Sequence, residues 1–196
     1  PTTEVRPSSS HRARFGSLWY QSRVASNTSE PTSVPTVSET TAVERVSTAL
    51  LRAEASQPKL NLFIEISHEE ALARAQHLDQ LHANGEPTGP LHGVPIGLKD
   101  LIDQSGHLTT AGSAFYRHEP GQSAVVVDRL EAAGAVIIGR TGLHEFAFGF
   151  STENPHFGPV RNPWDISTSA GGSSGGSGAA VAAGITPISI GTDTGG

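Results

Sequence analysis

A run of serine and glycine near the end of the chain is the first place where residue types suggest chemistry. Five glycines fall within the eight residues 171–178, and Ser173, Ser174 and Ser177 lie between them. Glycine loses more backbone entropy on folding than other residues, so such a run needs a reason. Small residues let the backbone approach a substrate closely, and the N–H groups of Gly191–Gly196 could stabilise a developing oxyanion. The two segments together indicate a catalytic loop.

A linker and a phosphate-binding loop both fit the serine-glycine run less well. A flexible linker would continue into polar sequence, whereas this run continues into the small apolar segment Ala179–Ala183. A phosphate-binding loop would carry a lysine after its last glycine, and a dinucleotide-binding loop would follow directly on a strand. The run has no such lysine, and we predict that Arg161–Ser169 is not a strand.

Lys99 is the second candidate for a chemical role. It lies between Leu98 and Leu101, and Val94 and Ile96 precede it. Lysine is rarely buried without a task, so this largely apolar segment makes Lys99 a candidate functional residue. A solvated surface lysine is the alternative that these residues alone leave open. A free lysine titrates near ~10.4, so a lysine base requires a site that lowers its pKa by desolvation or by a neighbouring positive charge.

Metal and thiol chemistry find no support. Neither His68-Glu69 nor His144-Glu145 is followed by the second histidine of an HExxH motif. The chain contains no cysteine, which excludes disulfides, thiolate nucleophiles and cysteine-ligated metals. We therefore expect no metal and no cofactor.

Alternating helices and strands are predicted around these segments. Apolar residues at helical spacing predict a helix that begins at Val43, and an alternating pattern predicts a strand from Leu60 to Ile66. Ser67 and Glu70 have the spacing of a capping box for a helix that runs to about Ala83. Farther along, Ser123 is the expected N-cap of a helix, Gly134 ends it, and Ala135–Ile138 form a short buried strand. This alternation predicts the α/β class.

Composition limits the classes of partner. The chain has 196 residues, of which 36% are hydrophobic and 16% charged, and its net charge is −6. An acidic chain without a cluster of basic residues gives no reason to expect direct contact with nucleic acid. No stretch approaches the ~18 consecutive apolar residues that a membrane-spanning helix needs. We expect no membrane span.

Residues 1–36 differ from the rest. They are rich in serine, threonine, proline and arginine without apolar periodicity, which predicts a disordered leader. The arginines also suit an organelle transit peptide, so we favour the cytoplasm but leave targeting open. The chain lacks methionine even at position 1, and we interpret it as a piece of a longer protein.

The motifs together resemble the amidase signature family. Gly171–Gly184 followed by Gly191–Gly196 is similar to the signature itself, and Gly93–Asp100 resembles the lysine segment of that family. Gly134–Thr141 and Glu145–Gly149 resemble its connecting strand and helix, and Asn162–Asp165 fits the same pattern. The resemblance covers roughly Val43–Gly196. It implies an amidase-signature fold over residues 37–196, with a mixed central β-sheet flanked by helices and incomplete at the C-terminus.

The resemblance also implies roles for individual residues. Lys99 matches the catalytic lysine, and Ser173 matches a bridging serine that typically follows a cis peptide bond. The nucleophile is a serine expected directly after Gly196, one residue past the end of this chain. Ser174 and Ser177 are expected to make hydrogen bonds within the loop. The resemblance assigns the remaining site positions to oxyanion-hole N–H groups (Thr194, Gly195 and Gly196) and to loop support (Thr192).

The implied reaction is hydrolysis of a linear, small-molecule carboxamide to a carboxylate and ammonia or an amine. This chain alone is expected to be inactive, and a homodimer is kept open. One alternative is the glutamine-hydrolysing A subunit of a tRNA-dependent amidotransferase. That subunit usually has methionine at Phe148 and a small polar residue at Phe150, so these residues, with Pro155 and His156, favour a stand-alone amidase. An alternative from another class is an inert truncation or a non-catalytic binding protein.

Overall fold

The structure, a computed structural model, describes residues 40–195. The predicted leader, residues 1–36, and Gly196 lie outside the described residues. Among the described helices, none has the length and hydropathy needed to cross a membrane.

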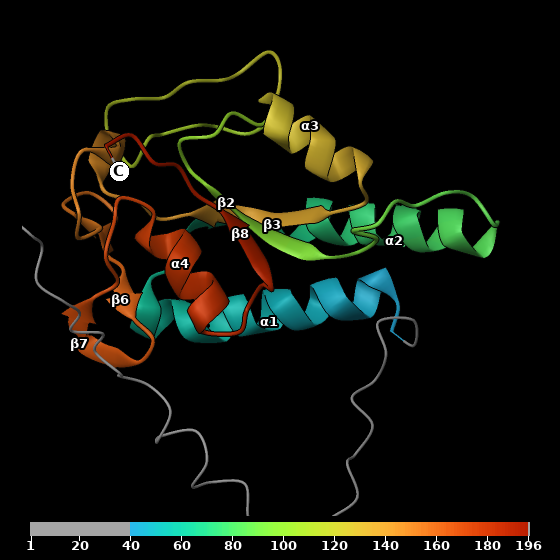
Figure 1. Cartoon of the computed structure of the whole chain (residues 1–196), viewed down its shortest axis with the longest axis horizontal. Helices are drawn as coiled ribbons and strands as arrows, with labels where there is room; N and C mark the ends of the chain where they lie inside the picture. Colours follow the sequence, from blue (N-terminus) through green and yellow to red (C-terminus); the bar gives the residue numbers. More distant parts are fainter. Residues whose placement is uncertain (1–39, 196) are drawn as a thin grey trace, which may run out of the picture. The chain divides into compact units, whose positions relative to one another are not determined.

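The centre of the described part is a four-stranded mixed sheet in the order β1-β3-β2-β8 (Figure 1). Strands β3, β2 and β8 run parallel, and β1 pairs antiparallel with β3 at one edge. The prediction of a mixed sheet flanked by helices is confirmed. These four strands are β1 (Phe63–Ile66), β2 (Pro95–Lys99), β3 (Val136–Thr141) and β8 (Ile188–Ile190).

Two hydrophobic cores cover the sheet. Three helices contribute to the larger core, which also contains Val136 and Ile138 of β3: α1 (Ala42–Leu60), α2 (His68–Ala83) and α4 (Gly175–Ala182). The smaller core joins Leu98 of β2 to Val127 of α3 (Val125–Ala132). Because successive strand residues point to opposite faces, Lys99 points away from the α3 core.

The glycine-rich segment lets α4 pack closely on the backbone of the sheet. The Gly176 N–H donates to the carbonyl of Gly142 at 2.9 Å, and a Cβ at position 176 would lie 2.5 Å from backbone atoms of Gly142 and 2.6 Å from the Leu62 carbonyl oxygen. Gly178, two residues later in the same helix, has no neighbouring atom within 4 Å of such a Cβ.

The difference between Gly176 and Gly178 predicts that substitution by alanine changes the stability in opposite directions at the two positions. In the complete protein that carries this chain, we expect Gly176→Ala to lower the free energy of unfolding by roughly 1–3 kcal/mol, because a rigid backbone must move. Gly178→Ala should leave it unchanged or raise it by up to about 1 kcal/mol through helix propensity. Urea unfolding of both variants measures this, and equal effects would show that α4 does not need the close approach.

The predicted start of the first strand is wrong. Helix α1 continues to Leu60, and the strand begins only at Phe63, because Asn61 adopts a left-handed conformation (φ 52°) that ends the helix. The alternating apolar pattern could not separate the last helical turn from the strand. The predicted stop at Ala83 is confirmed.

The predicted capping box at Ser67 and Glu70 does not form. Ser67 precedes the helix but makes no cap hydrogen bond, because its hydroxyl donates to Glu65 at 3.2 Å. A capping box is present instead at the start of α1. There Thr41 Oγ1 accepts from the Glu44 N–H at 3.1 Å, and Glu44 accepts from the Thr41 N–H at 2.9 Å.

Three further local predictions need correction. Ala124 rather than Ser123 is the N-cap of α3, because the Ser123 hydroxyl accepts from the Ser105 N–H at 2.9 Å. The predicted helix at Glu145–Gly149 is only a 3-10 turn. The segment Arg161–Ser169 is an antiparallel hairpin that pairs with itself rather than with the central sheet. The minor elements are η1 (Glu145–Ala147), β4 (Glu153–Asn154), β5 (Gly158–Pro159), β6 (Arg161–Asn162) and β7 (Asp165–Ser169).

Candidate active site

Lys99, the last residue of β2, lies at the centre of a hydroxyl cluster. Its side chain is fully buried. The Nζ atom is 2.8 Å from Ser173 Oγ, 2.8 Å from Ser174 Oγ and 2.6 Å from Thr192 Oγ1. The structure therefore brings together Lys99, Ser173 and Thr192 as expected, from three separate segments of the chain.

The position of Lys99 in the sheet explains this convergence. Lys99 pairs with Thr141 in the parallel neighbour β3, and β8 on its other side leads directly into the segment that carries Thr192. The serines precede α4, which packs near this end of the sheet. The Gly172–Ser173 peptide bond is cis, as the resemblance implies for the bridging serine.

The two serines differ in what else they bind. Ser174 Oγ accepts from the Thr192 N–H and donates to the Thr192 carbonyl, both at 3.1 Å, so its proton is already committed. Ser173 Oγ makes a hydrogen bond to Lys99 alone among the described residues. A hydroxyl has one proton and two acceptor sites, so Ser173 is the serine whose proton can be exchanged with Lys99.

Burial tunes Lys99 toward the neutral form. Desolvation lowers its pKa to about 8, from an ordinary value of 10.5, and the negative charge of Asp193 partly opposes that shift. A neutral amine has two donors and one lone pair. It can donate to Ser174 and Thr192 while it accepts the proton of Ser173. This arrangement is chemically suited to a general base.

The hydroxyl of Thr152 organises the loop that carries Ser173. Thr152 Oγ1 donates to the Gly171 carbonyl at 2.6 Å and accepts from the Gly175 N–H at 3.0 Å, on either side of Ser173. The residue is fully buried and has a left-handed backbone (φ 51°). We missed it in the sequence, where a threonine in a polar loop carries no distinguishing signal.

A buried ion pair fixes the end of β2 next to Lys99. The carboxylate of Asp100 accepts from Arg140 Nε at 3.2 Å and from the Thr110 backbone N–H at 3.1 Å. Burial raises the pKa of Asp100, and the contacts with Thr110 and Arg140 oppose the shift. The pair was also missed, although a charged residue directly after a predicted buried lysine was a signal that could have found it.

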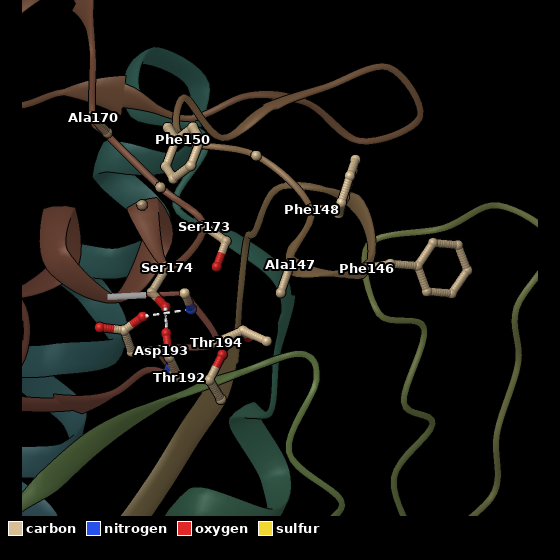
Figure 2. Close-up of a pocket in the computed structure, with 14 residues that line it drawn as sticks. Phe146, Ala147, Phe148, Phe150, Ala170, Ser173, Ser174, Thr192, Asp193 and Thr194 are labelled. Carbon is tan, nitrogen blue, oxygen red and sulfur yellow. Dashed lines mark hydrogen bonds between the residues drawn. The ribbon is translucent and has the colours of Figure 1, made fainter.

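A cavity of about 600 Å³ opens beside these groups. Figure 2 shows Ser173, Thr192 and Thr194 on one side of it and residues of the segment 146–150 on the other. Of the predicted oxyanion donors, Thr194 and Gly195 line the cavity, and Gly196 lies outside the described residues. The Gly195 N–H donates to Asp193 at 3.2 Å, so an oxyanion would have to replace that carboxylate.

Ser177 and the described acidic and histidine side chains do not form a further catalytic or metal-binding centre. Ser177 donates to the Ile190 carbonyl at 2.9 Å and contacts Thr141 Oγ1 at 2.7 Å, as expected for a loop residue. Within residues 40–195, no group of three or more acidic or histidine side chains could hold a metal ion. The described site combines Lys99, the hydroxyls around it and the carboxylate of Asp193.

Known proteins are similar to this chain over most of its described residues. A sequence model of the Amidase family matches residues 44–196. The A subunit of the glutamyl-tRNA(Gln) amidotransferase of Chloroflexus aggregans is 48% identical over 159 residues, which cover 81% of this chain and 33% of that protein. The protein of the same name from Cupriavidus necator is 54% identical over 138 residues, 70% of this chain and 27% of that protein. The chain thus spans about a third of the length of the curated relatives it matches.

Solved structures of other proteins are also similar to this chain. A structure of a vestigial protein complex, described as revealing the evolutionary origins of an s-triazine catabolic enzyme, has a TM-score of 0.77 and 46% identity over 80% of this chain and 35% of that one. The peptide amidase PAM in complex with the competitive inhibitor chymostatin has a TM-score of 0.73 and 36% identity, over 80% of this chain and 34% of that one.

Proposed function

Because the chain belongs to the amidase signature family, we propose that the complete protein hydrolyses the C–N bond of linear carboxamides with Lys99, Ser173 and a serine directly after Gly196. The observation that carries this proposal is the buried Lys99 amine, 2.8 Å from a Ser173 hydroxyl that has no other described partner. A buried lysine with a lowered pKa beside a cavity is typical of a catalytic group. No cofactor is required by this chemistry.

The proposed reaction is a proton relay. Neutral Lys99 accepts the proton of Ser173, Ser173 accepts the proton of the nucleophilic serine, and that serine attacks the amide carbonyl carbon. The oxyanion that forms is stabilised by N–H groups of Thr194, Gly195 and Gly196. The leaving nitrogen takes the proton back through the relay and departs as ammonia or an amine. Water then cleaves the acyl-enzyme by the same relay and gives the carboxylate.

The lowered pKa of Lys99 predicts the pH dependence of turnover. Only neutral Lys99 can accept a proton, so kcat/KM for an amide should rise with pH and level off above an inflection near pH 8. Asp193→Asn removes a charge that raises this pKa, so the inflection should move to lower pH. Ammonia release by the complete protein between pH 6 and 10 measures both. A rate that does not change from pH 7 to 9 would exclude Lys99 as the titrating base.

A second candidate is the glutamine-hydrolysing A subunit of a tRNA-dependent amidotransferase. The names of the relatives from Chloroflexus and Cupriavidus favour it. The aromatic residues Phe148 and Phe150 beside the cavity favour an amidase for other amides. Purification of the complete protein from its own cells distinguishes the two, because an amidotransferase component would copurify with B and C subunits. Isolation without them supports the stand-alone enzyme.

The third alternative, an inert or merely binding protein, requires that the complete protein releases no ammonia from any amide.

A further inference from the structure

We infer that the cavity beside Ser173 selects uncharged amides with a large apolar group, preferably aromatic, and that Phe148 and Phe150 form the surface that binds this group. The inference rests on the proposed amide hydrolysis and names its substrate class. It comes from the segment 146–150, which contributes three phenylalanines to the cavity wall.

Phe148 and Phe150 line the cavity and are exposed within the described part of the chain. Their exposed fractions are 89% and 88%, and both line the cavity that also contains Ser173. Apolar surface left in water gains free energy when a ligand covers it, and a phenyl group buried in this way changes affinity by roughly 10- to 100-fold. Two such side chains beside a polar reaction centre are therefore suited to an apolar substituent on the amide.

The segment 146–150 is attached to neighbouring residues through Phe146. The ring of Phe146 is 5.7 Å from that of Phe115 and 5.8 Å from that of Tyr116, between ring centroids. Figure 2 shows the Phe146 side chain pointing away from Ser173. The Phe146 N–H also donates to the Ala111 carbonyl at 2.8 Å. Phe146 thus anchors the segment to a neighbouring loop, whereas Phe148 and Phe150 have no such ring contact among the described residues.

The charge of the cavity disfavours a substrate with an anionic group. Of the described residues that line it, none is lysine, arginine or histidine, and Asp193 is the charged one. The ammonium nitrogen of a protonated Lys99 is already surrounded by three hydroxyls. A free amino acid amide such as glutamine carries a carboxylate that the described cavity wall does not complement. The volume of about 600 Å³ lies in the range of small-molecule sites.

A comparison of three amides in the complete protein tests the inference. Phenylacetamide carries the aromatic group, acetamide lacks it, and glutamine carries charges in its place. We expect kcat/KM for phenylacetamide to exceed that for glutamine, and Phe148→Ala and Phe150→Ala each to lower it by roughly 10-fold. The same variants should lower kcat/KM for acetamide by a smaller factor than for phenylacetamide, because acetamide has no aromatic group to lose contact with that surface.

Trp164→Ala is the matched control. Trp164 is similarly exposed, at 83%, but lies on the hairpin of β6 and β7 outside this cavity, so its loss should leave all three rates unchanged. Preference for glutamine, or an equal loss on all three amides in the phenylalanine variants, would overturn the inference while amide hydrolysis itself stands. Failure to release ammonia from any amide would overturn the proposed function and this inference with it.

Discussion

Replacing Lys99 with alanine is expected to lower kcat for amide hydrolysis by about 1,000-fold or more in the complete protein. The substitution removes the base of the proposed relay, which is the one described hydrogen-bond partner of the Ser173 hydroxyl. Because the proposed role of Lys99 lies in the chemical step, KM should change much less than kcat. The measurement is steady-state ammonia release with the wild type and the variant under identical conditions.

Lys99→Arg is the informative control for this prediction. Arginine keeps the positive charge and several donors, but it does not lose its proton at any pH used for the assay. We expect it to be as inactive as the alanine variant. Retention of near-normal kcat by either variant, with circular dichroism spectra like those of the wild type, would remove Lys99 from the mechanism.

Ser173→Ala and Ser174→Ala should differ strongly, although both hydroxyls lie 2.8 Å from Lys99 Nζ. Loss of Ser173 interrupts the relay, so kcat should fall by roughly 1,000-fold. Loss of Ser174 removes the hydrogen bonds to the Thr192 backbone, and each is worth about 1 kcal/mol. Its effect should be about 10-fold and should include a lower thermal stability.

The pH profile separates a relay role of Ser173 from simple support of the loop. Ser174→Ala should remove only the hydrogen bonds that hold the Thr192 backbone. The pH profile of its residual kcat/KM should therefore keep the inflection near pH 8 that reports the pKa of Lys99. Ser173→Ala should lose the inflection with the activity. Equal losses in the two variants, or a larger loss in Ser174→Ala, would show that Ser173 is not the relay serine.

Much of the fold could be predicted because its signals are local. Apolar residues at helical spacing identified α1 and α2, and Gly134 with its left-handed φ of 91° follows the C-cap of α3 as predicted. Predicted helix caps failed where the serine side chain had another hydrogen-bond partner. Ser67 bonds to Glu65 and Ser123 to the Ser105 backbone, and neither contact can be deduced from spacing.

The candidate site was predictable where burial and motif agreed. The apolar neighbours of Lys99 predicted a buried lysine, and the structure buries it fully. The support of the loop by Thr152 could not be predicted, because a left-handed threonine depends on contacts with residues about 20 positions away. The buried ion pair between Asp100 and Arg140 likewise depends on the parallel pairing of β2 and β3, which only the fold reveals.

The central claim is that a neutral Lys99, through Ser173, activates a serine directly after Gly196. Reaction of the complete protein with a fluorophosphonate, which forms an ester with an activated serine hydroxyl, followed by mass spectrometry of the peptides, tests it most directly. The account predicts one adduct, on the residue that follows Gly196, and none in Lys99→Ala. An adduct on Ser173 or Ser174 in the wild type, or undiminished labelling in Lys99→Ala, would contradict it.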